Sequence, residues 1–292
     1  CFGQISYVDQ HVEQRGFTNI WPAGKCEFGK VRRGAWFQVG TAFDKAGRVD
    51  FHQNRFLDSL KKFEDVIEQP QAKGFRDALL YWVAEVHFKG NNFARAASYY
   101  KMIIAEFPKS VYLAGAYYSL GWCLFQEGQF QDAMSNFVIL KEKFPQAPQN
   151  EDATFKIIEC LYNLKDYKGL KEKIKPYLKA YAKDPLKLSY LYFYLAESDF
   201  YSNDFKDAQE GYKKVIAAAS DAKIKALSNL GLAWAYLKLK AYPEAEKALR
   251  EIQAAGLDKR NLNVLYFAEA TIYSETNRFQ EAEKTYTELI NL

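Results

Sequence analysis

Hydrophobic side chains recur along this chain with a period of about 37 residues. One aromatic position returns at that interval, at Phe56, Phe93, Phe130, Tyr167, Phe205, Tyr242 and Phe279. Apolar or small residues follow each aromatic three, seven and ten positions later, as Ala133, Phe137 and Leu140 do after Phe130. Because residues three and four apart share one face of an α-helix, each block predicts an amphipathic helix that begins near its aromatic residue.

A second helix is predicted upstream of each aromatic. One of its positions is mostly small, at Ala84, Gly121, Ile158, Ala196, Ala233 and Ala270. Short segments rich in helix-breaking residues separate the two helices, as at 89–92 and 127–129. Pro108 and Pro145 follow the second helix, where a helix has to end. Each block is therefore predicted to be a hairpin of two helices that approach closely through small side chains.

The block from Ser119 to Pro145 resembles a tetratricopeptide repeat in its Leu-Gly, Gly, aromatic, Ala, aromatic and Pro landmarks. The segments YPEAEKAL, from Tyr242, and RFQEAEKTY, from Arg278, are similar to the second helix of this family. The resemblance covers about residues 35–292. It implies an all-α, right-handed superhelical solenoid of about seven hairpin repeats, with a short non-repeat extension over residues 1–34. A period above the usual ~34 residues is shared by many bacterial envelope repeats of this type.

Two blocks depart from the family pattern. Ile158 and Leu170 stand where small residues are expected, so the packing of the third full hairpin is predicted to be looser or shifted. About seven extra residues between Gly47 and Phe56 lengthen the first block.

A further series follows one side of each predicted first helix, and we call it the aromatic stripe. Of its 18 positions 11 are aromatic, against 16% of the whole chain. Its members are Tyr81, Glu85, Phe88, Tyr118, Trp122, Phe125, Phe155, Glu159, Tyr162, Phe193, Glu197, Phe200, Leu230, Trp234, Leu237, Phe267, Thr271 and Ser274. The stripe resembles the one that lines the concave groove of tetratricopeptide folds, where partner peptides lie. Exposed aromatic surface at this density predicts partner binding.

The three glutamates of the stripe predict a partner that is a protein or peptide segment, apolar with some basic character. Trp122 and Trp234 are predicted to be its strongest anchors. Two other interpretations remain open. The stripe packs within the core of the solenoid, or residues 1–34 of the same chain cover it.

Composition narrows the partner classes. The net charge of +4 is too small a surplus to indicate nucleic acid, and no run of about 18 apolar residues predicts a membrane-spanning helix. Eight lysines and three acids between Lys165 and Lys187 leave that segment about +5. We interpret it as a solvated outer face, with contact to anionic headgroups or to an acidic partner as the alternative.

The cysteines suggest a compartment. Three interpretations of Cys1 remain open: it carries lipid, as in bacterial lipoproteins, it forms a disulfide with Cys26, or it marks a fragment boundary. The first two interpretations predict a location in the bacterial periplasm or at the outer membrane. Residues 17–31 are predicted to form two short strands around a turn. Cys123 and Cys160 occupy equivalent places in adjacent blocks, too far apart for a disulfide, and are predicted to be buried free thiols.

No catalytic, cofactor-binding or metal-binding pattern is present. His11, His52 and His87 are scattered, and the chain has no phosphate loop, dinucleotide glycine pattern, nucleophile elbow or Cys-x-x-Cys pair. The sequence predicts a non-catalytic protein-protein interaction scaffold of a bacterial cell envelope, without cofactor or metal. The alternative is a structural subunit that self-associates head-to-tail, because the apolar Leu289 and Ile290 end the last predicted hairpin and need a neighbour.

Overall fold

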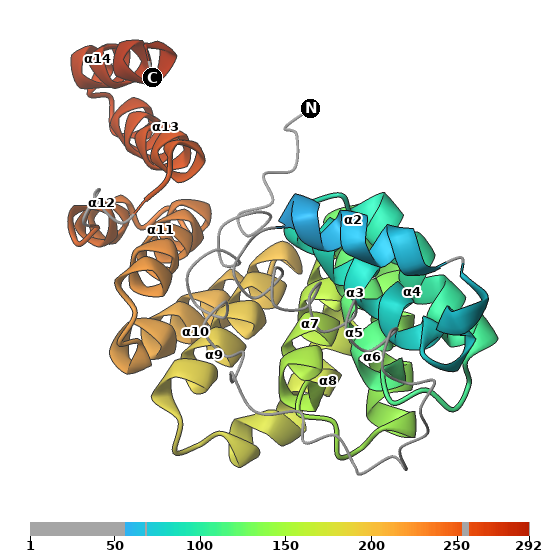
Figure 1. The fold of residues 1–292 in the computed structure, drawn as a ribbon. Coiled ribbons are helices and arrows are strands. Elements are labelled where there is room, and N and C mark those ends of the chain that lie inside the picture. The colour runs from blue at the N-terminus through green and yellow to red at the C-terminus, as the bar shows by residue number, and fades with distance from the viewer. Residues whose placement is uncertain (1–55, 68, 253–256, 292) are drawn as a thin grey trace.

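A computed structural model describes residues 56–67, 69–252 and 257–291 (Figure 1). These residues form α-helices and one short 3-10 helix, with no strand among them. The elements are α2 (Phe56–Ile67), η1 (Pro70–Gly74), α3 (Arg76–Lys89), α4 (Phe93–Glu106), α5 (Leu113–Gln126), α6 (Phe130–Lys143), α7 (Asn150–Asn163), α8 (Tyr167–Ala180), α9 (Pro185–Tyr201), α10 (Phe205–Ala218), α11 (Ala222–Lys238), α12 (Tyr242–Arg250), α13 (Lys259–Glu275) and α14 (Phe279–Ile290). The predicted extension over residues 1–34, its two strands, Cys1, Cys26 and the insertion before Phe56 lie outside the described residues.

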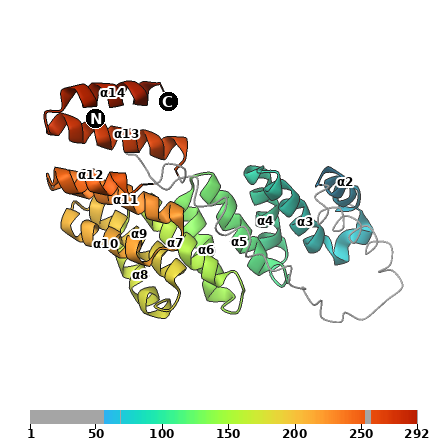
Figure 2. The same cartoon turned by 90° about the vertical axis from the view of Figure 1, so that its left-hand side faces the viewer.

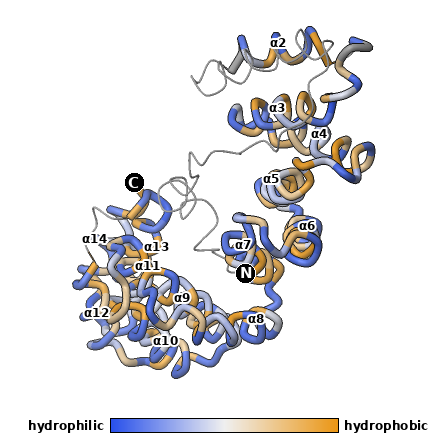
Figure 3. The backbone as a smooth tube through the Cα atoms, turned by 60° about the horizontal axis from the view of Figure 1, so that its bottom comes forward, coloured by the Kyte–Doolittle hydropathy of each residue, from blue (hydrophilic) through white to orange (hydrophobic). Residues whose placement is uncertain are grey.

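The helices pack against one another in chain order and build a curved solenoid. Figure 2 shows the hairpins following one another from α2 and α3 at one end to α13 and α14 at the other. In Figure 3 the helices α3, α5, α7, α9, α11 and α13 form the inner layer of an arc, and α4, α6, α8, α10, α12 and α14 form its outer layer. The all-α solenoid of helical hairpins predicted from the sequence is confirmed.

Small residues bring the two helices of a hairpin close together. A Cβ atom added to Gly121 of α5 would lie only 2.7 Å from the ring of Phe137 on α6. Ala133, also on α6, is completely buried. A bulky residue at position 133 is therefore expected to overpack this crossing at a cost of about 1–3 kcal/mol.

The hairpin of α7 and α8 differs from its neighbours. Ile158 and Leu170 are completely buried at the positions where other hairpins carry small residues. The two helices contact each other less extensively than α5 and α6 do, and α8 packs more against α9. The looser or shifted packing predicted for this hairpin is observed as a shift of α8 toward α9.

Every described hairpin turns through one residue in the left-handed conformation. Its φ angle lies between 57° and 74° at Asn91, Gly128, Lys165, Asn203, Lys240 and Asn277. Glycine and asparagine suit this backbone region, whereas a lysine there is held against its preference. Aspartates begin several of the following helices: the side chains of Asp166, Asp184, Asp221 and Asp258 accept hydrogen bonds from the first backbone N–H groups.

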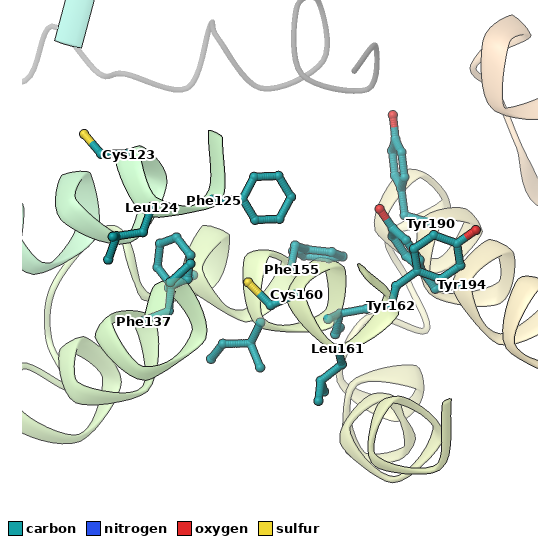
Figure 4. Packing of buried hydrophobic residues seen from close by; sticks show 14 of the residues in the cluster. Cys123, Leu124, Phe125, Phe137, Phe155, Cys160, Leu161, Tyr162, Tyr190 and Tyr194 are labelled. Atoms are coloured by element: carbon teal, nitrogen blue, oxygen red, sulfur yellow. The ribbon is translucent and has the colours of Figure 1, made fainter. Parts of the chain in front are cut away.

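One continuous apolar core runs between the two layers. Figure 4 shows part of this core, with Cys123 and Phe125 of α5 and Phe155 and Cys160 of α7. Cys123 and Cys160 are buried and free, as predicted. Burial raises the pKa of the Cys123 thiol to about 12, so this thiol stays protonated and unreactive at neutral pH.

Candidate functional site

The aromatic stripe lies on the helices of the inner layer (Figure 3), but neighbouring repeats bury almost half of it. Eight positions belong to the core: Tyr81, Glu85, Phe125, Phe155, Tyr162, Phe193, Glu197 and Leu230. A partner cannot reach these side chains in this structure. We therefore assign them to packing, the interpretation that the sequence left open, and leave them out of the candidate binding surface.

Six aromatic rings of the stripe remain half-buried. We call Phe88, Tyr118 and Trp122 the first ring set, and Phe200, Trp234 and Phe267 the second ring set. The two sets lie on either side of α7, whose own stripe rings, Phe155 and Tyr162, are buried. Glu159, Leu237, Thr271 and Ser274 complete the half-buried part of the stripe.

The chain itself holds the first ring set in place. The Phe88 ring packs edge-on against Phe93 at 5.6 Å between centroids. The hydroxyl of Tyr118 donates a hydrogen bond to Asp152 of the next repeat. Burial, and then the nearby Asp152 carboxylate, raises the pKa of Tyr118 well above its usual range. Rings fixed in this way lose little entropy when a partner covers them.

The second ring set contains a stacked pair. The Trp234 and Phe267 rings lie 5.8 Å apart and nearly parallel, with an interplanar angle of 26°. Phe200 packs edge-on against Phe205 at 5.4 Å. The indole N–H of Trp234 is buried and has no hydrogen-bond acceptor within the described part of the chain. Because the chain itself covers this N–H, only the ring atoms of Trp234 that stay accessible belong to the candidate binding surface.

Two of the three stripe glutamates are buried and bonded to tyrosines. The Tyr100 hydroxyl donates to Glu85 at 2.6 Å, and the Ser119 hydroxyl donates to the same oxygen at 3.3 Å. Glu197 accepts from Tyr212 at 2.5 Å and from Tyr162 at 2.8 Å. Burial raises the pKa of both carboxyl groups, and the tyrosine hydrogen bonds oppose that rise.

The third glutamate has a lysine partner. Lys156 of α7 lies 2.7 Å from Glu159, and only 5% of its side chain is exposed. The Lys156 ammonium also lies 3.8 Å from the centroid of the Trp122 ring and 5.0 Å from that of Phe125. An ammonium against an aromatic face is attracted by the ring's quadrupole, so this buried cation joins α7 to α5.

These contacts change the predicted chemistry of the partner. The expectation of basic character rested on Glu85, Glu159 and Glu197. The carboxyl groups of Glu85 and Glu197 are buried and accept hydrogen bonds from tyrosine hydroxyls. Glu159 already pairs with a lysine of the same chain. The aromatic surface that remains accessible favours apolar groups and carries no free acid of the stripe.

His87 is the one histidine within the described ranges. The His87 ring stacks on Tyr99 at 5.6 Å between centroids. The pKa of its imidazole is lowered, mainly because the group is buried. No group of three or more His, Cys, Asp or Glu side chains in the described ranges is arranged to hold a metal ion. None of the helices in those ranges is long and apolar enough to cross a membrane.

Sequence reasoning missed three residues that shape this site. Tyr100, Tyr212 and Lys156 bind the stripe glutamates. The two tyrosines stand seven positions after Phe93 and Phe205, at a repeat position that the sequence pattern assigned only to the apolar helix face. A signal was present for the tyrosines, since Tyr100 follows Glu85 by 15 residues and Tyr212 follows Glu197 by the same interval. Nothing in the local pattern pointed to Lys156, because its ring partner lies in another repeat.

Family comparisons agree with this architecture. The model of the tetratricopeptide repeat matches residues 77–110, and that of a tetratricopeptide repeat-like domain matches residues 166–291; together they span more than half of the chain. The chain belongs to the tetratricopeptide repeat family. A third model, YfiO, described as an outer membrane lipoprotein, matches residues 114–205. A comparison with curated proteins found no match.

Solved structures show the same fold at low sequence identity. A tetratricopeptide repeat protein from Parabacteroides merdae is 10% identical, with a TM-score of 0.64 over 86% of this chain and 92% of that one. The C-terminal part of a repeat-containing protein from Cytophaga hutchinsonii is 14% identical, with a TM-score of 0.59 over 85% and 95%. PilW, a type IV pilus biogenesis factor, is 16% identical, with a TM-score of 0.55 over 78% and 99%.

Proposed function

We propose that this protein is a non-catalytic scaffold of a bacterial cell envelope that binds segments of partner proteins on its inner layer. One observation carries the proposal: six rings of the aromatic stripe stay half-buried on the inner helices after the repeats have packed. Their contacts within the chain fix their orientation, as for Trp234 on Phe267. Aromatic anchors of this kind commonly dominate the energy of protein interfaces.

The partner segment carries apolar side chains that cover the two ring sets. The first set on α3 and α5 and the second set on α9, α11 and α13 form two anchoring regions, separated by the buried rings of α7. We expect Trp122 and Trp234 to contribute about 2 kcal/mol or more each to binding.

The envelope location rests on two lines of support. The outer membrane lipoprotein model matches residues 114–205. Cysteine is the residue type that carries lipid in bacterial lipoproteins, and Cys1 is the candidate for that modification. In this proposal a lipid on Cys1 holds the scaffold at a membrane surface, with a disulfide to Cys26 as the alternative use of that cysteine. Mass spectrometry of the protein from its native source distinguishes them, because an acylated N-terminus and a disulfide-linked peptide differ in mass.

A crosslinked pull-down from the native source tests the scaffold. The bait is the full chain, compared with its Trp122→Ala/Trp234→Ala variant. We expect partners that the unmodified chain captures to be lost from the double variant, because both ring sets lose their largest ring. Partners that remain bound to the double variant would contradict the role of the stripe.

Two further variants control for damage to the fold. Trp82→Ala removes a half-buried tryptophan of α3 that lies outside the stripe, and its partners should remain. Phe88→Ala/Phe200→Ala trims both ring sets without touching the ring that faces Lys156, and its partners should be lost. Thermal unfolding of each variant shows whether the solenoid is still folded.

A second candidate function is self-association. Phe279 and Ile290 of α14 are 65% and 82% exposed. In two earlier repeats the residue equivalent to Phe279 contacts the next repeat: Tyr167 stacks on Tyr201 at 5.7 Å, and Tyr242 donates a hydrogen bond to Glu275. A second copy of the chain that covers α14 would bury this apolar surface. Light scattering over a range of concentrations tests the idea, and a monomer throughout contradicts it. Phe279→Glu should abolish any assembly that forms through this surface.

A further inference from the structure

Helix α8 presents lysines on one exposed side. Lys168, Lys175 and Lys179 lie at positions i, i+7 and i+11, which fall within about 40° of one another around a helix and span about 16 Å along it. All three are exposed, and so is Lys183 in the turn that follows. We call Lys168, Lys175 and Lys179 the α8 lysine face.

The acids near this helix are engaged by other groups. Lys171 lies 2.6 Å from Asp199 and 3.7 Å from Asp204. Lys187 lies 2.6 Å from Glu151 and 3.2 Å from Asp184. These pairs take up the carboxylates that surround α8 on its packed side.

The α8 lysine face keeps a net positive charge. Asp166 at the start of the helix accepts a hydrogen bond from the Gly169 backbone. Lys168, Lys175 and Lys179 form no ion pair within the described part of the chain, and Glu172 is the one acid that α8 places among them. The face is therefore a positive surface on a helix of the outer layer, whereas the ring sets belong to helices of the inner layer (Figure 3).

We propose that the α8 lysine face binds the anionic headgroups of a phospholipid surface. The charge is complementary, because each lysine near such a surface strengthens binding about fivefold. Two exposed leucines lie near the helix in the sequence: Leu164, in the turn before α8, and Leu186, at the start of α9, are 38% and 40% exposed. Exposed leucines close in sequence to lysines suit the boundary between headgroups and acyl chains.

The residue type also favours lipid over an acidic protein. All eight basic residues between 165 and 187 are lysines. Lysine is a point charge on a flexible stem that adapts to laterally mobile phosphates, whereas fixed carboxylates are matched best by the planar fork of arginine. This contact does not depend on the ring sets, because it uses the other layer of the solenoid.

Vesicle co-sedimentation tests the proposal. The probes are vesicles of phosphatidylcholine alone and of phosphatidylcholine mixed with phosphatidylglycerol, and the protein is the full chain without lipid. We expect binding to the anionic vesicles only, weakened by added salt. The variant Lys168→Gln/Lys175→Gln/Lys179→Gln should bind about 100-fold more weakly, since three lysines are removed.

A matched variant separates the face from net charge. Lys101→Gln/Lys206→Gln/Lys247→Gln also removes three exposed lysines from outer-layer helices, but it takes one each from α4, α10 and α12. Its binding should stay within a fewfold of the unmodified chain, and circular dichroism should show both variants folded. Equal loss in both variants, or no binding of the unmodified chain to anionic vesicles, overturns the proposal. Binding to polyglutamate without binding to vesicles also overturns it and assigns the face to an acidic protein instead.

Discussion

Glu85 and Glu197 share one position of the repeat with Glu159, yet the three carboxyl groups have different surroundings. Glu85 and Glu197 are buried and accept hydrogen bonds from tyrosines on the second helix of their own hairpins. Glu159 is half-buried and pairs with Lys156 on its own helix. The position tolerates an acid in either setting, because each carboxyl group has found a donor.

The second helix explains the difference. Its position 15 residues after the glutamate holds Tyr100 and Tyr212 in the first two cases, and Ile174 in the case of Glu159. Isoleucine has no donor, so Lys156 supplies one, and its ammonium is stabilised further by the Trp122 ring. The repeat thus couples two positions: an acid on the first helix requires a hydroxyl on the second or a cation beside it.

The pair formed by Lys156 and Glu159 also lies between the two ring sets. Lys156 and Glu159 occupy the inner layer at α7, between the first ring set and the second. There the Lys156 ammonium covers part of the Trp122 ring, so a partner contacts the part of that ring that stays accessible. The proposed partner therefore meets half-buried rings on either side of α7.

The largest effect is expected from Glu197→Ala. This change leaves the hydroxyls of Tyr162 and Tyr212 without their acceptor in the core and opens a cavity. The free energy of unfolding should fall by about 3–5 kcal/mol, measured by urea denaturation followed by circular dichroism. Glu197→Gln keeps an acceptor and should cost about 1 kcal/mol or less. An equal loss in both variants would show that the hydrogen bonds do not matter.

The second-largest loss of stability is expected from Lys156→Ala. It removes the partner of Glu159 and the cation on Trp122, and should lower the free energy of unfolding by about 2–4 kcal/mol. The double variant Lys156→Met/Glu159→Gln removes both charges and should recover part of that loss. A double-mutant cycle in urea denaturation measures the coupling, and additive effects of the two single changes would contradict the pairing.

A smaller effect is expected from removing one hydroxyl. Tyr212→Phe deletes one of the two donors to Glu197 and should cost about 1–2 kcal/mol. Tyr286 occupies the same position in the last hairpin, where Thr271 replaces the glutamate and no hydrogen bond to its hydroxyl forms within the described residues. Tyr286→Phe should therefore change stability by less than about 0.5 kcal/mol. Comparable losses in the two variants would rule out a special role for the acid.

The smallest expected effect is a dependence of the free energy of unfolding on pH. Burial raises the pKa of Glu197 in the folded chain, so the folded state binds more protons than the unfolded state above about pH 4.5. Stability contributed by this group is present below that pH and decreases as the pH rises through the folded pKa. Glu197→Gln should lack this dependence, so its stability relative to the unmodified chain should increase between pH 5 and pH 8 in urea titrations. A constant difference would show that the folded carboxyl is not more basic than the unfolded one.

Sequence reasoning predicted the hairpins because their signals are local. The aromatic at the start of each second helix and the small residues near Gly121 and Ala133 follow helical spacing, which neighbouring residues impose on one another. The looser or shifted packing of the hairpin of Ile158 and Leu170 was also visible in this way. The left-handed backbone conformation of Lys240 was not predicted, because the turn geometry that closes a hairpin overrides the preference of one residue.

The candidate site was predicted only in part. The stripe was found as a pattern, but periodicity cannot tell a ring that faces solvent from one that the next repeat covers, as the contrast between Trp122 and Phe155 shows. That outcome depends on how successive hairpins are rotated against each other. Contacts such as that of Lys156 with Trp122 join adjacent repeats through residues 34 positions apart, and no local rule specifies them.

The sequence by itself determined the helices, the repeat, the small residues at the crossings and the positions of the stripe, because each depends on side chains within a few turns of one another. Only the tertiary structure decided which stripe residues are buried, which donor each glutamate uses and which lysines of α8 remain unpaired. Those outcomes depend on the packing of neighbouring repeats, in which burial from water changes the energy of every polar group and ring.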